Sequence, residues 1–155
     1  MRKIDQLLNE YGESHQNAFN KKVHWICVPL IFWSVVALLW SIKLPFQLSE
    51  HLQANSAIFA TILVLIYYVT LSIPLTLGMA LWTSVCLLVS QKLEAIQLLP
   101  LWAIALIVFV LAWVGQFYGH KIEGKKPSFF KDLQFLLIGP AWLMHFIFKK
   151  LSIAY

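Results

Sequence analysis

Long apolar runs separated by short polar segments dominate this chain. Residues 23–42 form one such run, of about the 20 residues that an α-helix needs to cross the hydrocarbon core of a bilayer. Residues 56–90 are too many for one crossing, and Pro74 divides them into two shorter stretches. The pattern therefore predicts an all-α, polytopic transmembrane helical bundle with four crossings, near residues 23–42, 56–73, 75–90 and 100–117.

The last apolar run, residues 133–148, is shorter and contains Gly139 and Pro140 in its middle. Because proline removes a backbone donor and disrupts a helix, we expect a re-entrant or interfacial helix broken at this pair, or a fifth crossing. The more polar segments 43–55 and 91–94 are expected to be loops between the spans.

Residues 1–22 are polar, but part of this segment carries a helical pattern. Four apolar residues recur at spacings of three or four, which predicts a short amphipathic helix over residues 3–12 that ends at Gly12: Ile4, Leu7, Leu8 and Tyr11. A length of 155 residues is typical of one domain, so residues 1–155 are expected to form a single integral membrane domain. The pattern leaves open whether the chain forms a homo-oligomer.

Composition strengthens the membrane interpretation. The chain is 60% hydrophobic and 12% charged, whereas soluble domains are about 25% charged. The basic residues lie in short clusters beside the apolar runs, which is typical of the positive-inside bias and of contact with a lipid bilayer, and not of nucleic-acid binding. Cys27 and Cys86 lie inside apolar runs and are expected to be small buried residues without a disulfide.

The charge pattern also favours one topology. The Lys-bearing N-terminus should be cytoplasmic. Four crossings then return the chain to the cytoplasm near residue 118, where the most basic loop follows, from Lys121 to Lys131. A single crossing by residues 56–90 would place that loop on the opposite side. We therefore expect an integral protein of a bacterial inner membrane or of the endoplasmic reticulum.

The same topology brings three histidines to one face. His15 and His24 precede or open the first span, and His120 follows the fourth. Imidazole is the commonest protein metal ligand, so a trio at this face predicts a metal site facing the cytoplasm. His15 and His24 are nine residues apart and would face opposite ways on one continuous helix, so the polar segment between them must bend.

Other polar side chains near the trio could support such a site. Asn17, Asn20 and Gln116 are expected to orient the imidazoles or the head group of a substrate. Glu123 lies one helical turn after His120 and could be a ligand or a hydrogen-bond acceptor. Lys125 and Lys126 could attract a lipid phosphate or a fatty-acid carboxylate, although the positive-inside bias explains them equally well.

Three functions are compatible with these residues. A metal-dependent membrane enzyme fits the trio best, but the residues alone do not choose between iron, zinc and copper. A zinc-dependent lipid hydrolase is one alternative, and a non-catalytic lipid-binding protein, in which the histidines only occupy the membrane interface, is another. His145, inside the last apolar run, is expected to be a satisfied histidine and not a ligand.

Two motifs resemble a known family. The first has the pattern H-x-N-x-x-N-x-x-x-H, here His15, Asn17, Asn20 and His24, within YGESHQNAFNKKVHWICVPL. The second is Q-x-x-G-H, here Gln116, Gly119 and His120, within GQFYGHKIEGKKPSF, and LLIGP follows it. In this order the motifs resemble the Mpo1-like family of small membrane proteins, over nearly the whole chain.

The resemblance implies an Fe²⁺-dependent dioxygenase that uses O₂ to shorten 2-hydroxy long-chain fatty acids by one carbon, a step of α-oxidation. Carried over, His15, His24 and His120 would bind the iron. Two positions depart from the family's yeast-like pattern: Gln16 stands in place of a second histidine, and the acidic residue after the Gly-His pair, Glu123, comes one position earlier.

Overall fold

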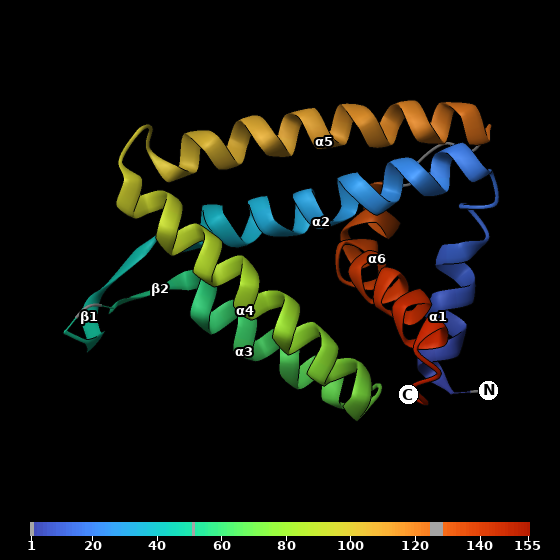
Figure 1. Ribbon diagram of the computed structural model, residues 1–155, viewed down its shortest axis with the longest axis horizontal. Helices are drawn as coiled ribbons and strands as arrows, with labels where there is room; N and C mark the ends of the chain where they lie inside the picture. The colour runs from blue at the N-terminus through green and yellow to red at the C-terminus, as the bar shows by residue number, and fades with distance from the viewer. Residues whose placement is uncertain (1, 51, 125–128) are drawn as a thin grey trace.

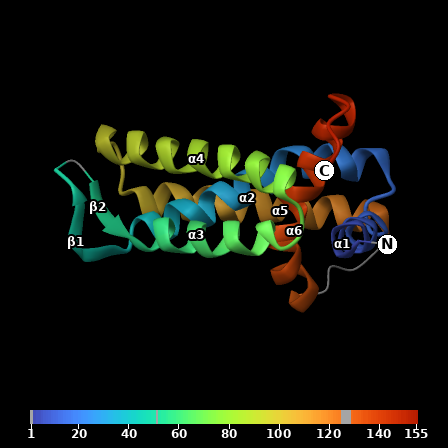
Figure 2. The same ribbon diagram turned by 90° about the horizontal axis from the view of Figure 1, so that it is seen from below.

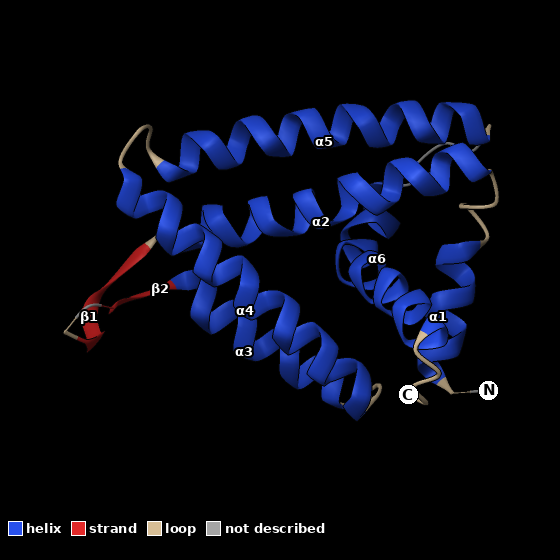
Figure 3. Ribbon diagram, in the orientation of Figure 1, coloured by secondary structure: helices blue, strands red, loops and turns tan. Residues whose placement is uncertain are grey.

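The computed structural model describes residues 2–50, 52–124 and 129–155. Helices make up most of this part of the chain, and a two-stranded sheet projects from one end (Figures 1 and 3). In chain order the elements are α1 (Lys3–Gly12), α2 (Ala18–Trp40), β1 (Lys43–Ser49), β2 (Leu52–Asn55), α3 (Ser56–Val69), α4 (Ile73–Ile96), α5 (Leu101–Glu123) and α6 (Phe129–Lys150).

Helices α2 and α5 lie side by side and run in opposite directions, so the start of α2 and the end of α5 share one end of the molecule (Figure 1). Helix α2 begins five residues before the predicted span because Asn17 caps it: its side-chain oxygen accepts hydrogen bonds from the amides of Phe19 and Asn20. Helix α5 continues past the predicted end at residue 117 to Glu123, and Gly124 follows it in the left-handed conformation.

The division of residues 56–90 is confirmed. Helix α3 ends at Val69, and α4 begins at Ile73 with Pro74 in its first turn, where a missing N–H breaks no helical hydrogen bond. The side chain of Ser72 caps α4 by accepting from the amide of Leu75. Helix α4 then extends to Ile96, so the loop predicted at residues 91–94 is wrong.

Among the described residues, three helices are long and apolar enough to cross a membrane: α2, α4 and α5. Helix α3 is apolar but has only 14 residues, fewer than the roughly 20 that a perpendicular crossing needs. The all-α architecture is thus confirmed, with three helices that could span a membrane, while a count of four crossings stays a prediction.

The expected loop at residues 43–55 is instead an antiparallel hairpin of β1 and β2 with an irregular register. Leu44, Phe46 and Leu48 alternate with Pro45 and Gln47, the period of two that favours a strand. Because β1 is mostly exposed, its alternation does not separate a buried face from an exposed one. The strand signal is therefore weak, and the polar residues of the segment suggested a loop.

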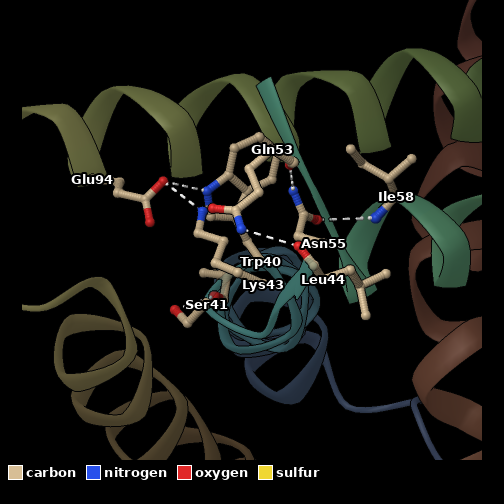
Figure 4. Close-up of polar contacts among 9 residues, drawn as sticks. Trp40, Ser41, Lys43, Leu44, Gln53, Asn55, Ile58 and Glu94 are labelled. Atoms are coloured by element: carbon tan, nitrogen blue, oxygen red, sulfur yellow. Dashed lines mark hydrogen bonds and ion pairs between the residues drawn. The ribbon is translucent and has the colours of Figure 1, made fainter. Parts of the chain in front are cut away.

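Side chains at the base of the hairpin connect it to the helices (Figure 4). The carboxylate of Glu94 on α4 accepts from Trp40 Nε1 and from Lys43 Nζ, each at 2.8 Å. The side chain of Asn55 caps α3 by accepting from the amide of Ile58 at 3.2 Å. The Glu94 contacts thus join the C-terminal turns of α4 to the end of α2 and to β1.

Helix α6 is continuous through Gly139 and Pro140, so the predicted break is wrong. It runs across the direction of α2 and α5 (Figure 2). The Tyr68 hydroxyl of α3 donates to the Leu137 carbonyl at 2.5 Å, three residues before the proline, and so joins α6 to α3. Whether α6 crosses the membrane stays a prediction.

Helix α1 matches its predicted bounds and packs along α6. Its four predicted apolar side chains are all buried. A Cβ at Gly139 of α6 would lie 3.0 Å from Tyr11 Oη and 3.2 Å from Val28 Cγ1, so the glycine lets α6 approach both α1 and α2. Helices α1 and α6 therefore pack together and cover one side of the N-terminal part of α2.

Candidate metal centre

The three predicted histidines converge at the shared end of α2 and α5. His15 lies in the short segment between α1 and α2, His24 in the second turn of α2, and His120 in the last turn of α5. A ligand atom from each lies within 4.8 Å of one from each of the others. The side chains are buried, with exposed fractions of 1%, 1% and 7% respectively. The predicted bend between His15 and His24 is confirmed, because α1 ends at Gly12 and α2 begins at Ala18.

Backbone carbonyls set the tautomers of two imidazoles. His15 Nδ1 lies 2.6 Å from the Tyr11 carbonyl oxygen, and His24 Nδ1 lies 2.9 Å from the Asn20 carbonyl oxygen. A carbonyl oxygen only accepts, so each Nδ1 carries the proton and donates it. Nε2 of each ring therefore keeps a free lone pair, which is the arrangement found in metal-ligating histidines.

Three ring nitrogens have no hydrogen-bond partner among the described residues, although all are buried: His15 Nε2, His24 Nε2 and His120 Nδ1. Leaving a buried polar atom unsatisfied costs about 1–3 kcal/mol. One cation between the three would satisfy all of them, because each would offer a lone pair. The donor set therefore fits a metal ion that prefers nitrogen ligands.

The environment of His15 keeps its imidazole neutral. Burial lowers the pKa of His15 from 6.5 to about 4, so the unprotonated form predominates at pH 7. Its ring stacks on Tyr11 with centroids 4.2 Å apart and lies 5.5 Å from Trp142 of α6. Aromatic side chains of α1 and α6 thus cover one side of the trio, and only a neutral imidazole can bind a metal.

Two glycines allow α5 to lie against α2 near the site. Gly115 and Gly119 form a Gly-x-x-x-Gly pattern, which permits close helix packing in membranes. A Cβ at Gly115 would lie 2.7 Å from Cys27 Sγ, and one at Gly119 would lie 2.4 Å from Asn20 Oδ1. Neither position has room for a side chain. This close approach brings the His24 and His120 rings to a centroid distance of 4.9 Å.

The structure places the predicted supporting residues around the trio. Asn17 caps α2, while Asn20 Nδ2 donates to the Ser14 carbonyl at 3.2 Å and to Glu123 Oε2 at 3.0 Å. Both partners accept, which identifies this end of the amide as the NH₂; Asn20 Oδ1 is buried and has no partner among the described residues. Gln116 is buried on α5, one turn before His120. Roles for these residues in orienting ligands or substrate stay predictions.

Lys125 and Lys126 lie outside the described residues. His145 is not part of the three-histidine cluster. Its Nδ1 contacts the Tyr155 hydroxyl, which agrees with the prediction of a satisfied histidine in place of a ligand. Cys27 and Cys86 are buried free thiols, which confirms that interpretation.

The role of Glu123 could not be chosen from the sequence. Its Oε1 accepts from the Gln16 amide at 2.9 Å and the Asn17 amide at 3.2 Å. Its Oε2 accepts from the Asn17 amide at 2.9 Å and from Asn20 Nδ2 at 3.0 Å. The spacing from His120 suggested either a ligand or an acceptor, and the structure shows an acceptor. No sequence signal identifies donors more than a hundred residues away.

Comparison with known proteins identifies the family of the chain. A family model described as 2-hydroxy-palmitic acid dioxygenase Mpo1-like matches residues 1–151. No curated protein and no solved structure matches the chain. The match spans both histidine motifs and nearly every helix, so the chain belongs to the Mpo1-like family.

Proposed function

We propose that this protein is an Fe²⁺-dependent dioxygenase that shortens 2-hydroxy long-chain fatty acids by one carbon, with O₂ as the oxidant. The observation that carries the proposal is the set of three buried imidazole nitrogens that have no hydrogen-bond partner in the part of the chain that the structure describes. The family description, which names 2-hydroxy-palmitic acid and a dioxygenase, supports the reaction. His15 and His24 would hold the ion through Nε2, and His120 through Nδ1.

Bound Fe²⁺ would supply oxygen activation and two coordination positions for the hydroxyl and carboxylate of a 2-hydroxy acid. The chain's own residues would position that head group. Asn20 and Gln116, both buried near the trio, are proposed to orient the hydroxyl and the carboxylate of the substrate. Lys125 and Lys126 are proposed to attract the negatively charged carboxylate of the substrate to the site.

The location of the trio suits an amphiphilic substrate. It lies at one end of two apolar helices, α2 and α5. The flank of α5 that leads toward the site is exposed and apolar, with Leu111, Val114 and Phe117 more than half exposed. We propose that this flank contacts lipid and that the acyl chain of the substrate lies along it. The Lys distribution supports a site on the cytoplasmic face.

The proposal is tested with the full chain purified in detergent and loaded with Fe²⁺. We expect about one iron per chain, and O₂-dependent conversion of 2-hydroxypalmitate into the acid one carbon shorter. His120→Ala should lose both properties, because it removes one of the three ligands. His145→Ala, at a histidine outside the trio, should retain both. Unchanged iron stoichiometry in His120→Ala would count decisively against the site.

A zinc hydrolase is the second candidate, because one specific observation favours it. Three histidines without a carboxylate ligand are a donor set that catalytic zinc sites use, and the Glu123 oxygens are already engaged by the segment that follows His15. Metal analysis of protein purified without added metal, followed by assays under argon, separates the candidates. Full turnover of a lipid ester without O₂ would replace the dioxygenase proposal with the hydrolase.

A further inference from the structure

Glu123 connects the end of α5 to the segment that carries His15. Its two oxygens accept from the Gln16 amide, the Asn17 amide and Asn20 Nδ2, at distances of 2.9–3.2 Å. Gln16 and Asn17 follow His15 directly in the chain. We call these contacts the Glu123 latch. Hydrogen bonds to a carboxylate are stronger than those between neutral groups, so the latch is a substantial constraint on this short segment.

His15 depends on such a constraint more than the other two histidines do. His24 and His120 lie within α2 and α5, which Gly115 and Gly119 hold in close contact. His15 lies between α1 and α2, and its own backbone amide bonds only locally, to the Gly12 carbonyl at 3.0 Å. The Glu123 latch directly ties the residues after His15 to α5, the helix that carries His120.

The contacts also argue against Glu123 as a metal ligand. Each carboxylate oxygen already accepts two hydrogen bonds, so both have used the lone pairs that point toward the segment. Breaking them to reach an ion would take the charged acceptor from the Gln16 and Asn17 amides and leave Asn20 Nδ2 with the Ser14 carbonyl alone. Binding through Glu123 would therefore release the segment that places His15.

We propose that Glu123 is a positioning residue that sets the distance between His15 and the other two imidazoles, and thereby the affinity of the metal site. The inference rests on the proposed metal site, but the order of the 13–17 segment can be measured without any metal. In this proposal Glu123, the acidic residue after the Gly-His pair, acts on the metal site by positioning His15 and does not coordinate the metal itself.

The test compares Glu123→Gln with Glu94→Gln in the full chain, in detergent. Glutamine has nearly the same shape as glutamate but loses the charge and one acceptor oxygen. Glu94 is a matched control, because its carboxylate also joins a helix to a neighbouring segment, through Trp40 and Lys43 (Figure 4). These contacts lie at the C-terminal end of α4, at the opposite end of the molecule from the end of α5 (Figure 1). Two quantities are measured: hydrogen exchange of peptides covering residues 13–20 without metal, and affinity for Co²⁺ from its visible absorption.

For Glu123→Gln we expect amide exchange in the 13–20 peptides about tenfold faster or more, as expected when charged hydrogen bonds are lost. We expect the affinity for Co²⁺ to fall about 10–100-fold, the usual effect of removing a group that orients a ligand, with the absorption bands of bound Co²⁺ keeping their positions. Glu94→Gln should leave both quantities at wild-type values.

Other outcomes overturn the inference. Wild-type exchange in Glu123→Gln would show that the latch does not order the segment. Faster exchange with unchanged affinity for Co²⁺ would separate the latch from the metal site. Shifted absorption bands would identify Glu123 as a ligand, and failure of the variant to fold would show a role far wider than the segment. If wild-type protein bound no Co²⁺, the proposed metal site would fail, and the exchange result alone would decide whether Glu123 orders the segment.

Discussion

Gly119→Ala tests the packing that places two of the three histidines. The new Cβ would lie 2.4 Å from Asn20 Oδ1, well inside contact distance. Asn20 cannot turn away freely, because its Nδ2 is bonded to the Ser14 carbonyl and to Glu123. Losing these two hydrogen bonds would cost about 1 kcal/mol for the carbonyl and about 1.5–3 kcal/mol for the carboxylate. Moving α5 away instead would cost about 1–3 kcal/mol, as overpacking usually does.

Alanine also stabilises a helix interior by about 0.5–1 kcal/mol relative to glycine. The less costly response is the movement of α5, and its cost less the helix gain leaves a net loss of about 1 kcal/mol, within a range of about 0–2.5 kcal/mol. Each kcal/mol lowers the Tm by roughly 2–4 °C in a chain of this size. Because His120 is the next residue, we also expect the affinity for Co²⁺ to fall at least about tenfold.

Gly12→Ala is the matched control. A Cβ there would meet Trp142 Nε1 at 3.5 Å, an ordinary van der Waals distance. Gly12 lies near the same site, because its carbonyl accepts from the His15 amide. The substitution creates no clash, so the Tm should stay unchanged or rise slightly, and the affinity for Co²⁺ should stay unchanged. Thermal unfolding followed by circular dichroism and a Co²⁺ titration measure both effects. Wild-type Tm and affinity in Gly119→Ala would refute the close contact between α2 and α5.

Three further predictions concern packing, metal binding and capping. The Tyr68 hydroxyl is bonded to the Leu137 carbonyl, so Tyr68→Phe should lower the free energy of unfolding by about 1 kcal/mol; an equal loss in the neighbouring Tyr67→Phe would contradict this. Saturating Co²⁺ should raise the Tm, since free metal at 100 times Kd stabilises by about 2.7 kcal/mol; an equal rise in His120→Ala would rule out the three-histidine site. Asn17→Ala removes the cap of α2 and should cost about 1 kcal/mol in thermal unfolding; an unchanged Tm would show that the cap contributes nothing.

Much of the fold could be predicted because the hydrophobic pattern is strong. The division at Pro74 followed from the length of the apolar run and from the effect of proline on a helix. Because it adds one helix between α2 and α5, it predicts that the start of α2 and the end of α5 lie at the same end of the bundle. The errors lie where local pattern and tertiary contacts compete. Pro140 was expected to break α6, but the helix continues through it, and a tertiary contact, the Tyr68 hydroxyl of α3 on the Leu137 carbonyl, holds the turn before the proline. The segment at residues 43–55 was expected to be a loop, because its strands bury little and give a weak signal.

For the candidate site, the sequence by itself predicted that three histidines meet at one end of the bundle, without choosing a metal. Histidine spacing, helix number and the direction of each apolar run are properties of local segments, and they suffice to bring His15, His24 and His120 to one end. Only the tertiary structure decided which ring nitrogens are free, because backbone carbonyls four residues earlier take Nδ1 of two rings. It also decided that Glu123 is an acceptor, since hydrogen bonds between residues a hundred positions apart exist only once packed helices bring them together.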